Sequence, residues 1–164
     1  MILQAHHLRI YADYYQFYLF NPNLPGNTAD PGFWNKEAFA RRFGYIPGTI
    51  GIGTASYDFV KAILEVHDGV PDLSLNDWDH VIECDLDAPD GRIGIAGCLA
   101  IPADEHIFDV TPGNYRVRCC YADLDKSSDD MAEGEEAGDW YLVQCWLQKD
   151  SPPVVRKWRP QEGA

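Results

Sequence analysis

The stretch "DHVIECDLDAPDGRIGIAGC", residues 79–98, decides the fold class. In its first half, the apolar residues Ile82, Cys84 and Leu86 occupy every second position, which is the period of a β-strand with one face on the core. The "APDG" that follows, residues 88–91, has the residue types of a tight turn, and a second apolar run comes after it. This stretch therefore predicts two strands joined as a hairpin.

The same period of two appears on both sides of this stretch. In "YDFVKAILEVHDG", residues 57–69, one alternating set is uniformly apolar and is expected to face the core; it comprises Val60, Ala62, Leu64 and Val66. The aromatic segment 7–20 predicts either two short strands with a break near Ala12 and Asp13 or one bulged strand. Residues 111–124 and 139–148 add two further strands, and in the first of these Val117, Cys119 and Tyr121 share one face.

Strands outnumber helices in every part of the chain. Only "FWNKEAFARRFGY" favours a helix, near residues 33–43, and no alternation of strands and helices is present. We therefore expect one domain over residues 1–164: an all-β antiparallel sandwich of two sheets with about 7–9 strands and one short helix. The proline-bracketed tail, residues 150–164, is expected to dock along a sheet edge.

The charge of the chain limits its partners. With 13 Lys and Arg against 26 Asp and Glu, the formal net charge is −13. Such a surface repels phosphate backbones and anionic lipids, which argues against direct binding to nucleic acid or membrane, and it favours a basic protein, a cation or simple solubility. The five cysteines lack the C-x-x-C spacing of zinc and redox sites, so no cofactor is predicted. No signal peptide or membrane span is recognised, and a cytoplasmic location is expected.

Carboxylates concentrate in the segment between the last two predicted strands, the acidic loop of residues 122–139. The candidate partner-binding residues in it are Asp123, Asp125, Asp129 and Asp130. A calcium-binding loop is an alternative, but the EF-hand pattern fails because Ser128 stands where a Gly is needed and Gly134 stands where a Glu is needed. A lid over a small-ligand or cation site remains an alternative role for this loop.

A second acidic group lies on the opening strand itself. Glu83, Asp85 and Asp87 have period two, so their side chains share one face. That face is either wetted by solvent or part of a binding surface. A hydrolase with Glu83 and Asp85 as paired carboxylates is a further alternative, because two neighbouring carboxylates can divide the roles of acid and base. No nucleophile motif or metal-type histidine spacing is present.

Two acidic surfaces on one rigid scaffold suggest a protein that imitates the phosphate rows of a nucleic acid. Such a surface would be drawn to a basic groove, as in a nuclease or toxin domain. Exposed aromatic side chains would supply anchors, and the candidates are Trp78, Trp140, Trp146 and Trp158. The function predicted from sequence is therefore a non-enzymatic inhibitor or immunity protein. Pairing of edge strands could also give a homodimer.

Three segments carry a resemblance to a known family: "YYQFYLF", "PGNYRVRCCYADL" and "DWYLVQCWL". The chain resembles the competence protein J family, inhibitors of a DNA-entry nuclease, and related bacterial sandwich domains regarded as immunity proteins. The matching positions are Pro112, Gly113, Tyr115, Tyr141 and Trp146, and the resemblance covers roughly residues 8–20 and 79–147. It implies a sandwich fold and an inhibitor role, and it brings no catalytic residues with it.

Overall fold

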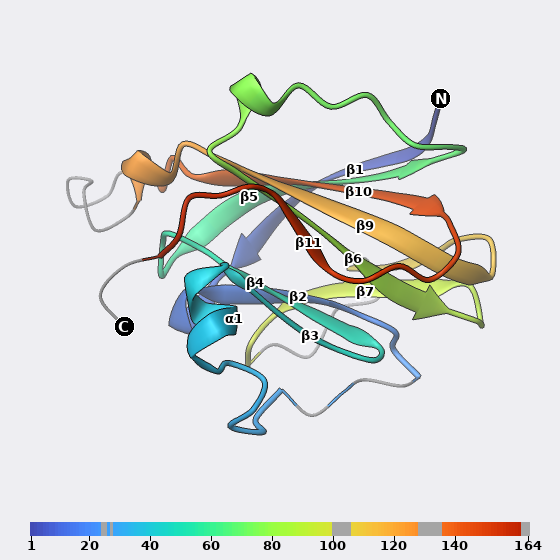
Figure 1. The fold of residues 1–164 in the computed structure, drawn as a ribbon, viewed down its shortest axis with the longest axis horizontal. Helices are drawn as coiled ribbons and strands as arrows, with labels where there is room; N and C mark the ends of the chain where they lie inside the picture. The colour runs from blue at the N-terminus through green and yellow to red at the C-terminus, as the bar shows by residue number, and fades with distance from the viewer. Residues whose placement is uncertain (24–25, 27, 100–105, 128–135, 162–164) are drawn as a thin grey trace.

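The computed structural model describes residues 1–23, 26, 28–99, 106–127 and 136–161 and confirms the sandwich. The six-stranded sheet has, in spatial order, β1 (Ile2–Tyr11), β5 (Phe59–His67), β10 (Trp140–Leu147), β9 (Gly113–Ala122), β6 (His80–Ala88) and β11 (Val154–Lys157). The five-stranded sheet has β3 (Phe43–Ile46), β4 (Thr49–Gly53), β2 (Gln16–Phe20), β7 (Arg92–Gly97) and β8 (Ile107–Asp109). Figure 1 shows the two sheets as stacked layers.

Helix is sparse in the described residues. The α-helix α1 (Lys36–Ala40) is shorter than the predicted span, and Asn35 caps it by accepting a hydrogen bond from the Ala38 amide. The 3₁₀ turns are η1 (Asp13–Tyr15), η2 (Leu75–Asp77) and η4 (Leu124–Lys126). None of the described helices has the length and apolar character that crossing a bilayer requires.

The core lies between the sheets, where the alternating sets place their apolar members. Val60, Ala62, Leu64 and Val66 of β5 are buried in it, as the pattern predicts, and so are Val117, Cys119 and Tyr121 of β9. Of the two alternatives for the aromatic segment, two strands with a break is correct: β1 ends at Tyr11, and β2, which begins at Gln16, belongs to the other sheet. The tail also docks as expected, because β11 pairs with β6.

The predicted hairpin at residues 88–91 is wrong. The turn is tight, with the Gly91 amide donating to the Ala88 carbonyl and Gly91 at a φ of 73° that favours glycine. However, β6 pairs with β9 and β11, whereas β7 pairs with β2 and β8 in the other sheet. The turn is thus a corner between sheets, because turn residues reverse the chain without choosing its neighbours. One pair, β5 with β10, is parallel, so the fold is mostly but not wholly antiparallel.

Candidate functional site

Two of the predicted binding carboxylates, Glu83 and Asp85, are buried. They point from β6 to the outer face of the six-stranded sheet, where the cross-strand partner of Glu83 is Arg118 and that of Asp85 is Arg116. Arg118 Nε donates to Glu83 Oε2 at 3.0 Å, and Arg116 Nη1 donates to Asp85 Oδ1 at 2.8 Å. All four side chains are less than a tenth exposed. Each carboxylate is therefore neutralised within the chain.

We call these four residues, Glu83, Asp85, Arg116 and Arg118, the arginine layer. The tail packs over it and contributes hydrogen bonds to it. Arg116 donates to the carbonyl oxygens of Ser151 and Pro152, each at 2.9 Å, and Arg156 of β11 donates to Glu83 at 3.0 Å. On the other side, Arg118 donates to the Pro71 carbonyl at 2.9 Å. Glu83 and Asp85 are thus buried and form ion pairs with arginines. The hydrolase alternative needs a free acid and a free base, and these two carboxylates do not provide them.

Asp87, by contrast, is exposed, and it lines an open groove of about 500 Å³ at the end of β6. Asp150 lines the same groove from the tail, and in the described part of the chain neither carboxylate has an ion pair with Lys or Arg. Burial raises the pKa of Tyr45, with the negative charges of Asp85 and Asp150 adding to the effect. We call this site the acidic groove; its lining is Tyr45, Pro47, Gly48, Asp85, Asp87, Asn114, Asp150, Ser151, Pro152 and Pro153.

The predicted residues of the acidic loop lie far from this groove. Asp123 is nine residues along from Asn114, the partner of Asp87, so β9 separates the two carboxylates by about 30 Å. Figure 1 shows η4 and the corner after β6 at opposite ends of the molecule. Asp123 forms an ion pair with Lys126, and Asp125 forms one with Arg159. Asp129 and Asp130 lie outside the described residues. The two predicted acidic groups therefore do not form one surface.

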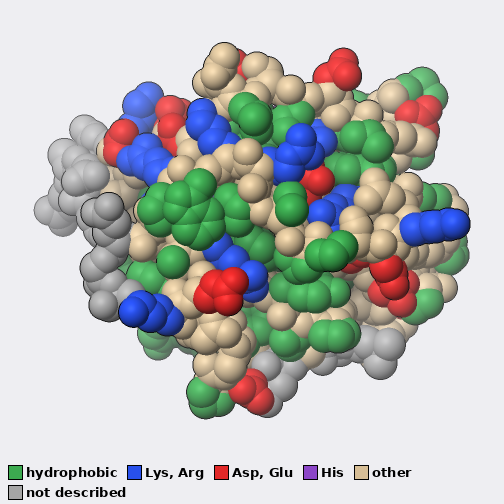
Figure 2. Space-filling view, viewed as in Figure 1, with side chains coloured by type: hydrophobic (Ala, Val, Ile, Leu, Met, Phe, Trp, Pro, Cys, Tyr) green, Lys and Arg blue, Asp and Glu red, His purple; other side chains and the backbone are tan. Residues whose placement is uncertain are grey.

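The face that carries β11 is mixed in character. Figure 2 shows Lys and Arg side chains among Asp and Glu on it, with hydrophobic side chains between them. Of the predicted aromatic anchors, Trp158 is 52% exposed, whereas Trp146 is buried. Trp78 and Trp140 are partly exposed and contact each other, with ring centroids 5.2 Å apart. In the described ranges, no three His, Cys, Asp or Glu side chains come together as a metal site would require.

Two solved structures have a similar architecture. One is ComJ from Bacillus subtilis, described as an inhibitor of the DNA degrading activity of NucA, with a TM-score of 0.63 and 16% sequence identity over 90% of this chain and 98% of that one. The chain shares its fold with ComJ. The product of crocagin biosynthetic gene J is also similar, with a TM-score of 0.58 and 14% identity over 89% of this chain and 98% of that one. No family model and no curated protein sequence matches.

These structures confirm, at the level of the fold, the resemblance predicted from sequence. Sequence reasoning missed Asp150, Tyr45 and Asn114 as neighbours of Asp87. Asn114 could have been found only by pairing residues 111–124 with β6, a pairing that was not predicted from the sequence. Asp150 and Tyr45 come from the tail and from the other sheet, and no local pattern connects them with Asp87.

Proposed function

We propose that this protein is a non-enzymatic inhibitor that binds a basic protein, a nuclease or a toxin domain of similar charge, through the acidic groove. The observation that carries the proposal is the pair of exposed carboxylates, Asp87 and Asp150, that share one groove and have no ion pair with a described Lys or Arg. On a chain with a net charge of −13, this groove offers an uncompensated site for Lys or Arg side chains.

The groove is held in place before any partner arrives. Asp87 is the next-to-last residue of β6, and its backbone is fixed by pairing with Asn114 of β9. Asp150 precedes Ser151, whose amide donates to Asp85 Oδ2 at 2.8 Å and whose carbonyl accepts from Arg116. Because both carboxylates sit on anchored backbone, a partner would lose little conformational freedom on this side when it binds. Tyr45 adds an aromatic ring beside the charges, as binding hot spots often do.

The structural comparisons support the class of partner. ComJ inhibits a DNA-degrading activity, and enzymes of that kind bind a polyanion through basic surfaces. An acidic protein of the same fold could occupy such a surface in place of nucleic acid. The charge of the partner, the cytoplasmic location and the contribution of the acidic loop are parts of this proposal. Asp123 and Asp125 would act at a second contact, since they lie at the other end of β9.

The test begins with capture of partners from the native lysate at low salt on the immobilised protein. Proteins released by a salt step are assayed for DNA degradation, and each active protein is purified and titrated with the inhibitor. We expect a nuclease that the wild-type chain inhibits, with affinity that falls steeply as salt rises, because exposed charges are screened within about 10 Å at 0.1 M. Binding that is indifferent to salt would contradict the mechanism.

Two double variants that remove equal charge test whether the acidic groove is the binding site. The double variant Asp87→Asn/Asp150→Asn removes the two groove charges, and we expect it to weaken binding at least tenfold. The double variant Asp72→Asn/Asp77→Asn changes the net charge equally, but its two exposed residues lie on the segment between β5 and β6. If both double variants bind equally well or equally poorly, the groove is not the binding site.

A further inference from the structure

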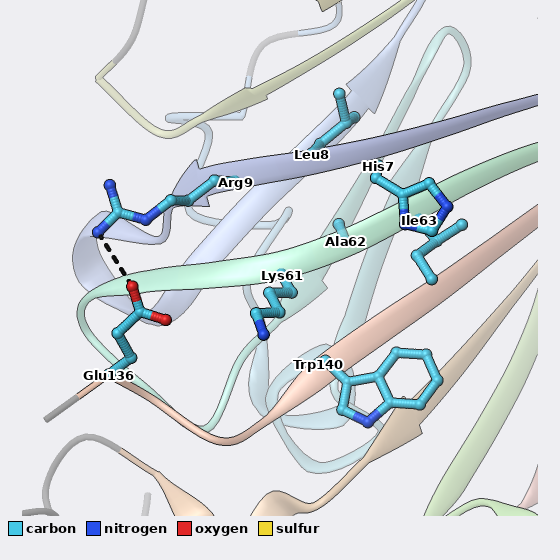
Figure 3. Close-up of a pocket in the computed structure, with 8 residues that line it drawn as sticks. All are labelled: His7, Leu8, Arg9, Lys61, Ala62, Ile63, Glu136 and Trp140. Atoms are coloured by element: carbon cyan, nitrogen blue, oxygen red, sulfur yellow. Dashed lines mark ion pairs between the residues drawn. The ribbon is translucent and has the colours of Figure 1, made fainter.

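The described residues cover the outer face of the six-stranded sheet only in part. On the β6 and β9 side, the arginine layer is covered by the segment of residues 68–79, whose Pro71 carbonyl accepts from Arg118, and by Ser151 and Pro152 of the tail. On the other side, residues of β1, β5 and β10 form an open groove of about 640 Å³, shown in Figure 3. Its lining is His7, Leu8, Arg9, Lys61, Ala62, Ile63, Glu136 and Trp140. Its size is that of a site for a small molecule.

Two cations stand directly opposite each other in this groove. Arg9 of β1 pairs in register with Lys61 of β5, and both side chains are exposed. Like charges opposite each other on neighbouring strands destabilise a sheet. Among the described carboxylates, Glu136 is the one that approaches Arg9, at a distance of 3.9 Å, and Lys61 has no ion pair. In a chain with twice as many acids as bases, the described carboxylates leave one positive charge of this pair without an ion-pair partner.

Aromatic rings border the two cations. Trp140 of β10 pairs in register with Lys61, so Arg9, Lys61 and Trp140 form a row across three strands. Trp78, from the covering segment, contacts Trp140, which therefore marks the boundary between the covered and the open parts of the face. At the other end of the row, the Arg9 guanidinium carbon lies 3.9 Å from the centroid of the Phe59 ring. This stacking holds the guanidinium in place beside the groove.

We propose that this groove binds an aromatic carboxylate, a planar ring that carries one organic anion. The ring would pack against Trp140 and Ile63, and the carboxylate would accept hydrogen bonds from Lys61 and Arg9. Neighbouring strands are about 5 Å apart, so these contacts lie within reach of one small molecule. The carboxylate would replace Glu136, whose ion pair with Arg9 is long and solvent-exposed and therefore weak. This site goes beyond the proposed inhibitor function and does not depend on it.

The test uses three probes with the same ring: 3-phenylpropanoate, its neutral amide and the cationic 3-phenylpropylamine. Binding is followed by NMR through the indole N–H of Trp140, assigned with a Trp140→Phe variant. We expect a saturable shift with the carboxylate and little response to the amide or the amine. Absence of saturation with millimolar carboxylate, or an amine that binds as tightly, would overturn the proposal.

Two substitutions with opposite expected signs sharpen the test. Lys61→Met keeps the aliphatic stem, removes the charge and should weaken carboxylate binding about tenfold. Glu136→Gln removes the internal competitor and should strengthen binding about twofold to fivefold. Lys149→Met is the control, because it removes an equal charge from an exposed lysine after the far end of β10. Thermal melts establish that each variant is folded. If Lys61→Met and Lys149→Met have equal effects, the groove is not the site.

Discussion

Replacing Arg116 with Met is expected to destabilise the protein strongly. The Arg116 side chain is 4% exposed. Its guanidinium forms ion pairs with Asp85 and Glu83 and donates hydrogen bonds to the carbonyl oxygens of Ser151 and Pro152. Methionine fills most of the same volume but leaves Asp85 buried without its main cation. Removal of one partner from a buried ion pair costs about 3–5 kcal/mol. We take the lower half of this range, since loss of the Arg116 contacts to the tail would let water reach the carboxylate.

For a chain of this length, 1 kcal/mol lowers the melting temperature by about 2–4 °C, so Arg116→Met should melt roughly 10 °C below the wild type. Urea unfolding followed by tryptophan fluorescence would give the free energy directly. Arg92→Met is the matched control, because Arg92 has no ion pair in the described part of the chain, and it should cost under about 0.5 kcal/mol.

Limited proteolysis distinguishes the loss of the ion pairs and tail contacts from a loss of side-chain packing alone. If Arg116 holds the tail, its loss should speed tryptic cleavage at Lys149, Arg156 and Lys157, while the sandwich stays resistant. The double variant Arg116→Met/Asp85→Asn should cost less than the sum of the single variants, because it leaves no unpaired buried charge. A loss under about 1 kcal/mol for Arg116→Met, with an intact tail, would refute the reasoning.

Two further predictions concern titration and reactivity. Burial lowers the pKa of His80 to about 4, below its usual 6.5, so between these pH values the unfolded chain binds a proton that the folded chain does not. Stability should therefore fall as the pH drops from 6.5 to 4, by up to about 3 kcal/mol, and urea midpoints should show a shallower fall for His80→Gln. Burial raises the pKa of all five thiols, but Cys98 is partly exposed, whereas Cys84, Cys119, Cys120 and Cys145 are buried. A thiol reagent such as DTNB should modify Cys98 first in the folded protein and all five cysteines after unfolding; fast reaction of a second thiol would contradict the burial.

The sequence predicted those parts of the fold that depend on local alternation. Val60 to Val66 show the period of two because one face of β5 packs on the core along its whole length. The polar Asp13, which interrupts an aromatic run, made a break after Tyr11 one of two alternatives, with a single bulged strand as the other. Sheet membership was not predictable in this way. Whether β7 joins β6 or crosses to β2 depends on the packing of two sheets, and turn residues carry no information about it.

The arginine layer could have been predicted from the sequence, had the charges of the two strands that form it been compared. Glu83 and Asp85 have period two on one strand, and Arg116 and Arg118 have period two on another. Two such sets with opposite charge favour antiparallel pairing in the register that the structure shows. Considered on β6 alone, Glu83 and Asp85 suggested a binding surface. Considered together with Arg116 and Arg118 on the neighbouring strand, they indicate a buried network of ion pairs. Asp87 is the exception because its partner in register is Asn114, which carries no charge.

The arginine layer and the proposed binding site are connected through the tail, which contacts the layer and contributes Asp150 to the groove beside Asp87. Arg116 neutralises Asp85 and, with the same guanidinium, fixes the carbonyl oxygens of Ser151 and Pro152. Those contacts hold the tail where Asp150 enters the groove beside Asp87. The ion pairs therefore do more than remove charge from the surface: they also position Asp150, one of the two groove carboxylates that have no ion pair among the described residues. Under the proposed function, the net charge of −13 would attract a basic partner from a distance, and the arginine layer would determine where on the molecule that partner binds.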